Sequence, residues 1–440
     1  MNLAELNKVA VAMTANGKGI LAADESSGTI KKRFDAIGVE CTEDNRRDYR
    51  EMLFRSTEAM SKCISGVILY DETIWQKAKD GTPLVDLIKK AGSIPGIKVD
   101  EGTKPLPECP GELITIGLDK LADRLTKYYE QGARFAKWRA VIDIGAGIPT
   151  STAIRTNTHA LARYAALCQA AQIVPIVEPE VLMDGDHDID RCYEVTEAVL
   201  NAQFEELYQQ RVALEGIVLK PNMAISGKKA GKRAGIQEVA EKTVKLLKRT
   251  VPGAVPGIAF LSGGQSDEEA TAHLDAMNKI GSLPWNLTFS YGRALQAAPQ
   301  KAWSGKSENV AAGQRVPCGT AIALADLHQQ LVGPVDRSPA TFTAAGVLPV
   351  DAHSWNRPYS PLLRYPWERS YDALVGAAAS MAPSPFDGTV LRYVNPITGD
   401  DVMSTMGAQL QRLDGGFATR SEEHTSELQS LRHLVCRLLL

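Results

Sequence analysis

The sequence lacks a long apolar run and a strong net charge, and both absences limit what the protein can bind. Its most apolar stretch, around residues 373–379, is far shorter than the roughly 20 residues that cross a bilayer. The first residues contain no basic start followed by an apolar segment, so we expect no signal peptide. A formal net charge of −3 provides no general attraction for nucleic acid. We therefore expect a protein whose partners include neither a membrane nor a nucleic acid.

Cysteine is sparse and lacks the spacing of a metal or disulfide motif. The seven cysteines are scattered, and no two of them stand in C-x-x-C spacing. This pattern is typical of reduced thiols and predicts a cytoplasmic protein. The segment Asp184-Gly-Asp-His187-Asp contains metal-binding residue types, but its one histidine has no partner at ligand spacing. We interpret this segment as a loop and expect no metal and no other cofactor.

Lysine is absent from the last part of the chain, which marks a change of composition. Lys306 is the last lysine, although lysines are frequent before it, and prolines become frequent after residue 316. Such a shift indicates that the chain joins two different units. We expect the first unit to end near residue 316.

The first unit repeats one pattern, in which a short apolar run precedes a stretch with helical periodicity. Several runs are uninterrupted and β-branched, which is typical of buried parallel strands. Eight such units in about 290 residues predict an α/β fold, a (β/α)8 TIM barrel over residues 1–316. A doubly wound sheet is the alternative, but the Gly-rich phosphate motif that follows its first strand is missing. The predicted strands are Gly19–Ala23, Gly66–Tyr70, Pro95–Val99, Arg134–Trp138, Val174–Val177, Gly216–Leu219, Ile258–Leu261 and Asn286–Phe289.

Polar and charged side chains follow these strands at the point where each strand ends. In a barrel, the carboxyl ends of the strands converge at one mouth, where catalytic residues lie. We expect Lys220, which ends an apolar strand, to point into this mouth, because an ammonium group buried in an apolar layer is costly. The strand-end residues are Asp24, Glu25, Asp71, Glu72, Lys98, Lys137, Arg139, Glu178, Glu180, Lys220, Ser262, Ser290 and Arg293.

The strand-end lysines predict covalent chemistry on a carbonyl substrate. Burial and the charge of a second cation lower the pKa of an ammonium group, and Lys137 and Lys220 form such a pair in the predicted barrel. A neutral amine attacks a carbonyl and forms a Schiff base, which withdraws electrons from the neighbouring bonds. Glu178 and Asp24 are the carboxylates that would transfer protons around the same carbon skeleton.

Two further features predict that the substrate is an anion that carries phosphate. Ser262-Gly-Gly follows the seventh strand and precedes Ser266 and an acidic helix start. Barrels often bind phosphate at this place, through backbone N–H groups at a helix N-terminus. Surplus positive charge at the mouth comes from Lys98, Arg139 and Arg293.

Six segments, in order and with similar spacing, closely resemble class I fructose-bisphosphate aldolase from about Leu21 to Arg315. The resemblance implies a metal-independent lyase of glycolysis, a homotetramer that cleaves fructose 1,6-bisphosphate to dihydroxyacetone phosphate and glyceraldehyde 3-phosphate through a Schiff base. The segments are Gly-Ile-Leu-Ala-Ala-Asp24-Glu-Ser, Phe-Ala-Lys137-Trp-Arg139, Val-Pro-Ile-Val-Glu178-Pro-Glu180, Leu-Lys220-Pro-Asn-Met, Phe-Leu-Ser262-Gly-Gly-Gln-Ser and Phe-Ser-Tyr-Gly-Arg293-Ala-Leu-Gln.

The resemblance also implies a role for each matched residue. Lys220 would form the Schiff base, and Glu178 would act as acid and base. Asp24 would accept the proton of the C4 hydroxyl, Lys137 would be an electrostatic partner, and Glu180 would belong to the same catalytic group. The residues implied to bind the substrate are Ser26, Thr29 and Arg33 along the pocket, Lys98 and Arg139 near the 6-phosphate, and Ser262, Gly263, Gly292 and Arg293 near the 1-phosphate.

The residues after 316 fall into three further segments. In residues 317–336 we find no resemblance that we can name, and we expect an unassigned linker there. Residues from about 337 to 419 resemble a fragment of gentisate 1,2-dioxygenase, a cupin enzyme, but the match stops before that family's iron-binding histidines. Residues 420–430, within a tail over 420–440, resemble a translated sequencing adapter. We therefore expect residues 337–419 to be a truncated, poorly ordered fragment. We also expect the whole chain to be assembled from unrelated pieces.

Two alternative functions follow from this organisation. A catalytically impaired barrel would act as a binding protein, which the intact catalytic positions argue against. A bifunctional fusion with a ring-cleaving dioxygenase is disfavoured by the absent iron ligands.

Overall fold

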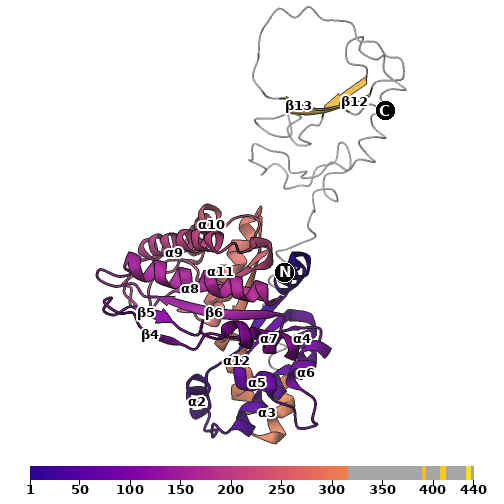
Figure 1. Cartoon of the computed structure of the whole chain (residues 1–440), viewed down its shortest axis with the longest axis vertical. Coiled ribbons are helices and arrows are strands. Elements are labelled where there is room, and N and C mark those ends of the chain that lie inside the picture. Colours follow the sequence, from indigo (N-terminus) through magenta and orange to yellow (C-terminus); the bar gives the residue numbers. More distant parts are fainter. Residues whose placement is uncertain (316–388, 393–406, 413–432, 438–440) are drawn as a thin grey trace, which may run out of the picture. The chain divides into compact units, whose positions relative to one another are not determined.

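The computed structural model describes residues 1–315 and three short strands at 389–392, 407–412 and 433–437 (Figure 1). The chain divides into two compact units, Met1–Val332 and Gly333–Leu440. The predicted linker over residues 317–336 lies outside the described residues.

Eight parallel strands of the first unit close into a barrel in the order β1-β10-β9-β8-β7-β6-β3-β2. Because neighbouring strands are parallel all around the barrel, their carboxyl ends lie at one mouth. This arrangement confirms the predicted (β/α)8 barrel, and each predicted run overlaps one observed strand. The barrel strands are β1 (Gly19–Ala23), β2 (Ile64–Leu69), β3 (Ile94–Lys98), β6 (Phe135–Ile142), β7 (Val174–Val181), β8 (Val218–Leu219), β9 (Gly257–Phe260) and β10 (Asn286–Tyr291).

A cluster of buried side chains closes the end of the barrel opposite the mouth. Phe135, Val174 and Val218 are each the first residue of a strand, and they pack in one cluster with Leu6 of the first helix. A Cβ atom at Gly96 would lie 2.3 Å from the ring of Phe135, so a larger residue would not fit there. The packing seals this end and leaves the mouth as the open face.

Helices cover the outside of the barrel, and each turns an apolar face inward. In Figure 1, α8 to α11 lie along one side of the barrel, where successive helices pack against one another. Helix α10 shows the pattern, because it buries Val239, Val244 and Leu247 at helical spacing. The helices are α1 (Leu3–Met13), α2 (Ser27–Asp35), α3 (Glu43–Phe54), α4 (Thr57–Cys63), α5 (Asp71–Trp75), α6 (Leu84–Lys90), α7 (Leu121–Gln131), α8 (Ser151–Ala170), α9 (Ile189–Gln209), α10 (Ile236–Thr250), α11 (Asp267–Ile280) and α12 (Arg293–Trp303), with short 3₁₀ turns η1 (Leu214–Gly216) and η2 (Ser307–Asn309).

The connection between β3 and β6 contains a hairpin that the sequence analysis did not predict. Strands β4 (Thr103–Pro105) and β5 (Leu113–Thr115) pair in antiparallel register outside the barrel. The Thr115 hydroxyl donates to the Arg139 carbonyl at 2.8 Å and ties the hairpin to β6. The hairpin therefore holds residues 102 and 103 next to the mouth.

The described part of the second unit is a three-stranded sheet. Strand β12 (Gly407–Arg412) pairs in antiparallel register with β11 (Thr389–Arg392) and in parallel register with β13 (His433–Arg437). Most of the segment predicted to resemble gentisate dioxygenase, and all of residues 420–430, lie outside the described residues. Strand β13 falls within the predicted tail.

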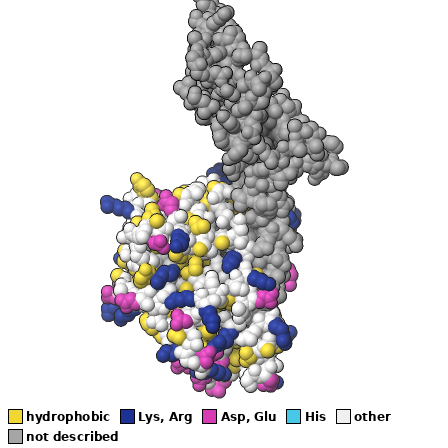
Figure 2. Space-filling view, turned by 90° about the vertical axis from the view of Figure 1, so that its right-hand side faces the viewer, with side chains coloured by type: hydrophobic (Ala, Val, Ile, Leu, Met, Phe, Trp, Pro, Cys, Tyr) yellow, Lys and Arg dark blue, Asp and Glu magenta, His cyan; other side chains and the backbone are white. Residues whose placement is uncertain are grey.

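The surface of the described part is mixed in character. On the face drawn in Figure 2, apolar side chains alternate with basic and acidic ones. Over the described residues, no helix combines the length and the apolar character that a membrane crossing requires.

Candidate active site

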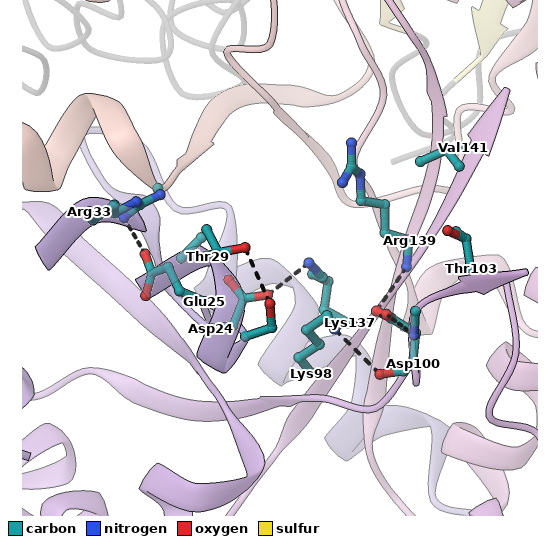
Figure 3. A pocket seen from close by; sticks show the side chains of 14 residues that line it. Asp24, Glu25, Thr29, Arg33, Lys98, Asp100, Thr103, Lys137, Arg139 and Val141 are labelled. Carbon is teal, nitrogen blue, oxygen red and sulfur yellow. Dashed lines mark hydrogen bonds and ion pairs between the residues drawn. The ribbon is translucent and has the colours of Figure 1, made fainter. Parts of the chain in front are cut away.

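A cavity of about 300 Å³ opens where β1, β3 and β6 end. Figure 3 shows Asp24 and Lys137 near its centre, with Arg33 on one side of them and Arg139 on the other. The predicted site residues that line the cavity are Asp24, Ser26, Thr29, Arg33, Lys98, Lys137, Arg139 and Gly292. The other lining residues are Ala22, Glu25, Asp100, Gly102, Thr103 and Val141.

Four charged side chains of alternating sign form a continuous row that begins in this cavity. Asp24 Oδ2 lies 2.7 Å from Lys137 Nζ, and Lys137 Nζ lies 3.5 Å from Glu178 Oε2. The other carboxylate oxygen of Glu178, Oε1, lies 3.1 Å from Lys220 Nζ. The structure thus brings together four of the residues predicted to be catalytic. We call Asp24, Lys137, Glu178 and Lys220 the charged row.

The register of the strands positions the charged row. Because its members are buried, each charge needs an opposite charge beside it. Strands β6 and β7 place Arg139 beside Glu178, and the N–H of Lys220 donates to the Val177 carbonyl at 2.8 Å. Lys137, Glu178 and Lys220 are only 6%, 3% and 4% exposed. Ionised groups that are buried to this extent are stable only when other charges compensate them. Each member of the row therefore depends on its neighbours.

The acidic residues near the row differ in their pKa values. Burial raises the pKa of Asp24, but Lys137 and Lys220 outweigh burial and lower it to about 2. Burial opposes the same two lysines at Glu178, whose pKa they lower below its usual value. At Glu180 burial dominates and raises the pKa, although Arg139 acts against it. Asp24 and Glu178 are therefore carboxylates at neutral pH.

The pKa of Lys137 differs from the prediction that it is lowered. Burial does lower the pKa, but the carboxylates of Asp24, Glu178 and Asp100 outweigh burial and raise it above its usual value. The prediction considered only burial and the second lysine, whereas the structure places Glu178 between the two ammonium groups. Lys137 is a stable cation, which suits an electrostatic role and not a nucleophilic one.

One side of the cavity carries an arginine on a polar framework. Arg33 extends from α2 and forms an ion pair with Glu25 (Figure 3). Gln296 Nε2 donates to Glu25 Oε1 at 2.7 Å, and the buried Arg50 donates to the Glu25 carbonyl at 3.2 Å. These contacts fix the position of Glu25, and its ion pair with Arg33 in turn holds the Arg33 guanidinium in the cavity lining.

The other side of the cavity carries two more cations. Lys98 Nζ lies 2.9 Å from Asp100 Oδ1, and Arg139 forms an ion pair with Glu180. The cavity therefore has cations on both sides of the Asp24–Lys137 pair, each held by a carboxylate, and a ligand with two anionic ends could bind these cations in place of the carboxylates.

The predicted phosphate-binding loop lies next to the cavity and not in its lining. A Cβ atom at Gly263 would lie 3.1 Å from Glu180 Oε1, which places the loop against the acidic partner of Arg139. Arg293 Nη1 lies 2.9 Å from Asp267 Oδ1. The predicted site residues outside the cavity lining are Glu178, Glu180, Lys220, Ser262, Gly263 and Arg293.

Sequence reasoning missed several residues that the structure places at the site. Asp100 stands two positions after Lys98, so the period of a strand could have indicated that both lie on one side. Gln296 stands three positions after Arg293 and so shares a face of α12 with it. Thr103 carried no signal, because its position depends on the unpredicted hairpin.

The histidine segment that contains metal-binding residue types is a loop, as predicted. His187 lies between β7 and α9, and neither of its ring nitrogens has a hydrogen-bond partner among the described residues. Within the part of the chain that the structure describes, no group of three or more His, Cys, Asp or Glu side chains could hold a metal ion.

Comparison with known proteins identifies relatives of the barrel. The family model for fructose-bisphosphate aldolase class-I matches residues 5–330. A probable fructose-bisphosphate aldolase class 1 from Xanthomonas campestris is 60% identical over 304 residues, which make up 69% of this chain and 91% of that protein. The cytosolic fructose-bisphosphate aldolase 6 of Arabidopsis thaliana is 57% identical over 299 residues, or 68% of this chain and 83% of that protein.

A solved structure is similar as well. It is fructose-bisphosphate aldolase from Plasmodium falciparum in complex with TRAP and a small molecule inhibitor, with a TM-score of 0.72 and 48% identity. The similarity covers 74% of this chain and 94% of that chain. These matches give no support to the resemblance of residues 337–419 to gentisate dioxygenase or of residues 420–430 to an adapter, and both stay predictions.

Proposed function

Because the chain belongs to the class I fructose-bisphosphate aldolase family, we propose that Lys220 forms the Schiff base with its substrate. The reaction of this family is the reversible cleavage of fructose 1,6-bisphosphate to dihydroxyacetone phosphate and glyceraldehyde 3-phosphate. The contact that supports the proposal is the 3.1 Å distance between Lys220 Nζ and Glu178 Oε1, in a setting where both are buried. A carboxylate at this distance can accept the proton that an ammonium group must lose before it attacks a carbonyl.

Schiff-base formation then uses the same pair. The Lys220 amine attacks the C2 carbonyl of the open-chain sugar, and a carbon–nitrogen bond forms. Glu178 returns the proton to the resulting hydroxyl group, which leaves as water. The product is an iminium ion that withdraws electrons from the C3–C4 bond.

Cleavage of the carbon–carbon bond uses the other end of the charged row. Asp24 accepts the proton of the C4 hydroxyl, the C3–C4 bond breaks, and its electron pair moves to the iminium nitrogen. Glyceraldehyde 3-phosphate leaves, and protonation at C3 followed by hydrolysis releases dihydroxyacetone phosphate and restores Lys220. The lowered pKa of Asp24, about 2, keeps the group in the ionised form that accepts a proton. Lys137, 2.7 Å away, stabilises the negative charges beside it.

The basic residues would bind the two phosphates. We assign Lys98 and Arg139 to the 6-phosphate, and Ser262, Gly263, Gly292 and Arg293 to the 1-phosphate. Ser26, Thr29 and Arg33 would line the path between them, and Glu180 would orient Arg139. An anion that binds Lys98 or Arg139 replaces Asp100 or Glu180 as the partner of that cation.

Substitution of the proposed nucleophile tests this assignment. Lys220→Ala should remove cleavage activity, because no other side chain can supply the covalent electron sink. The matched control is Lys228→Ala, since Lys228 is an exposed lysine that pairs with Asp184 outside the cavity. Substantial cleavage by the Lys220→Ala protein would refute the assignment, and activity of the control should equal that of the wild type.

We further propose that the protein is a cytoplasmic homotetramer, as the family resemblance implies. The alternative of a barrel that only binds partners is not favoured, because the charged row is intact. For residues 337–440 we retain the prediction of a non-catalytic fragment and tail. Sedimentation of the purified chain measures the assembly, and a monomer would contradict the tetramer.

A further inference from the structure

Gln265 joins the predicted phosphate-binding loop to helix α11 and is almost completely buried. Its side chain and backbone are only 5% exposed, and its N–H donates to the Ser262 carbonyl at 3.3 Å. The next residue, Ser266, caps α11 through a reciprocal pair of hydrogen bonds with Glu269. Gln265 is therefore the point at which the loop meets a firmly capped helix.

A buried histidine fixes the orientation of the Gln265 side chain. His273 Nδ1 lies 2.6 Å from Gln265 Oε1, and His273 is 4% exposed on the inner side of α11. Burial lowers the pKa of His273 below its usual value, so the imidazole is neutral at physiological pH. A neutral imidazole that donates from Nδ1 forms an ordinary hydrogen bond to the amide oxygen.

The backbone of Gln265 in turn holds Arg293. Arg293 Nη2 donates to the Gln265 carbonyl at 2.9 Å, while Nη1 pairs with Asp267 Oδ1 at 2.9 Å. The guanidinium is thus fixed by two groups that flank the start of α11. If the peptide group of residue 265 rotated, its carbonyl would no longer face Arg293 Nη2, and that hydrogen bond would be lost.

The side chain of Gln265 carries a feature that packing alone does not explain. Its amide nitrogen is buried and has no hydrogen-bond partner among the described residues. A buried unpaired amide group destabilises a protein, whereas an apolar side chain of similar size would not. The benefit of a glutamine here is the contact that its oxygen makes with His273.

We propose that His273 and Gln265 are positioning residues that hold Arg293 ready for the 1-phosphate of the substrate. His273 fixes the Gln265 side chain, the fixed residue sets the direction of its backbone carbonyl, and that carbonyl orients the Arg293 guanidinium. This inference rests on the proposed function, in which Arg293 binds phosphate. A guanidinium that is oriented before the substrate arrives loses less conformational freedom on binding.

The test compares His273→Leu with His273→Asn in steady-state cleavage of fructose 1,6-bisphosphate. Leucine fills the buried position but removes the donor, whereas the asparagine amide nitrogen stands where the histidine has Nδ1. We expect His273→Leu to raise KM about 2- to 10-fold with little change in kcat, as the loss of one hydrogen bond predicts. His273→Asn should restore a KM close to that of the wild type.

A double-mutant cycle with Arg293→Met separates this inference from the proposed function. Arg293→Met alone should raise KM, and adding His273→Leu should then raise it no further, because the positioned group is gone. An unchanged KM for Arg293→Met would refute the phosphate role of Arg293. Two results would overturn the inference and leave the proposed function intact. In the first, Arg293→Met raises KM but His273→Leu does not. In the second, both substitutions raise KM and the double variant shows the product of the two increases.

If the His273→Leu chain does not fold, Gln265→Met tests the same link from the other partner. Methionine is of similar length and cannot accept the histidine hydrogen bond, while the backbone carbonyl of residue 265 remains. The same rise in KM, absent when Arg293 is methionine, supports the inference. A wild-type KM for a folded Gln265→Met protein overturns it.

Discussion

Replacement of Lys137 by methionine would test how strongly the charged row depends on its central cation. The substitution keeps most of the length of the side chain and leaves Asp24 and Glu178 without their shared partner. The shift of the Asp24 pKa from 3.8 to about 2 is the net result of burial, which raises the pKa, and of Lys137, Lys220 and Lys98, which lower it; it corresponds to about 2 kcal/mol of net stabilisation of the carboxylate, because one pKa unit is about 1.4 kcal/mol. Removing one partner of a buried ion pair costs roughly 3–5 kcal/mol, since the other charge stays buried and unpaired. We expect Lys137→Met to lower the free energy of unfolding of the barrel by roughly 3–5 kcal/mol at pH 7.

Urea unfolding followed by circular dichroism measures this loss, and a second substitution tests its cause. Asp24→Asn in the Lys137→Met background removes the unpaired carboxylate, so the double variant should recover about 2 kcal/mol of the loss. Lys228→Met is the control, and its surface pair with Asp184 should contribute less than about 1 kcal/mol. The electrostatic reasoning is refuted if Lys137→Met has the unfolding free energy of the wild type. It is also refuted if Lys137→Met and Asp24→Asn lower that free energy by independent amounts that add in the double variant.

Three other expectations follow from the structure. The stabilisation from Asp24, whose folded pKa of about 2 lies below its usual 3.8, is complete above about pH 5 and is lost as the pH falls toward 2. The difference in unfolding free energy between wild type and Asp24→Asn should therefore shrink on acidification, and a constant difference would contradict the shift. Arg139→Met should raise KM for fructose 1,6-bisphosphate about tenfold but leave fructose 1-phosphate unaffected in the same assay; equal effects would remove Arg139 from the 6-phosphate. A chain that ends after Val332 should cleave fructose 1,6-bisphosphate as fast as the full chain, because all described site residues precede that point, and a clear loss of kcat would assign a role to the later residues.

The sequence predicted the barrel well because the strands have simple local signals. Uninterrupted apolar runs such as Val174–Val177 mark buried strands, and the polar or charged residues that follow the runs mark the mouth. Once eight parallel strands close into a barrel, the residues at their carboxyl ends, such as Asp24 and Glu178, must lie at the same mouth. This is why the members of the charged row could be named before their contacts were known.

Other features depend on contacts between distant segments and could not be predicted. The raised pKa of Lys137 results from the carboxylates of Asp24, Glu178 and Asp100, which come from three different parts of the chain, and their positions relative to the lysine have no local signal. The hairpin that places Thr103 at the cavity consists of two very short strands without alternation. The contact between His273 and Gln265 spans the start of a helix, and no local signal in the sequence indicates that these two side chains are partners.

The central claim is that Lys220 carries the substrate during cleavage. Borohydride reduction of the full chain during turnover of fructose 1,6-bisphosphate, followed by peptide mapping with mass spectrometry, tests it most directly, because reduction converts the transient imine to a stable amine. The account predicts one modified lysine, Lys220, whose amino group lies 3.1 Å from its proton acceptor Glu178. A reduced adduct on Lys137 or Lys98 with Lys220 unmodified would contradict it.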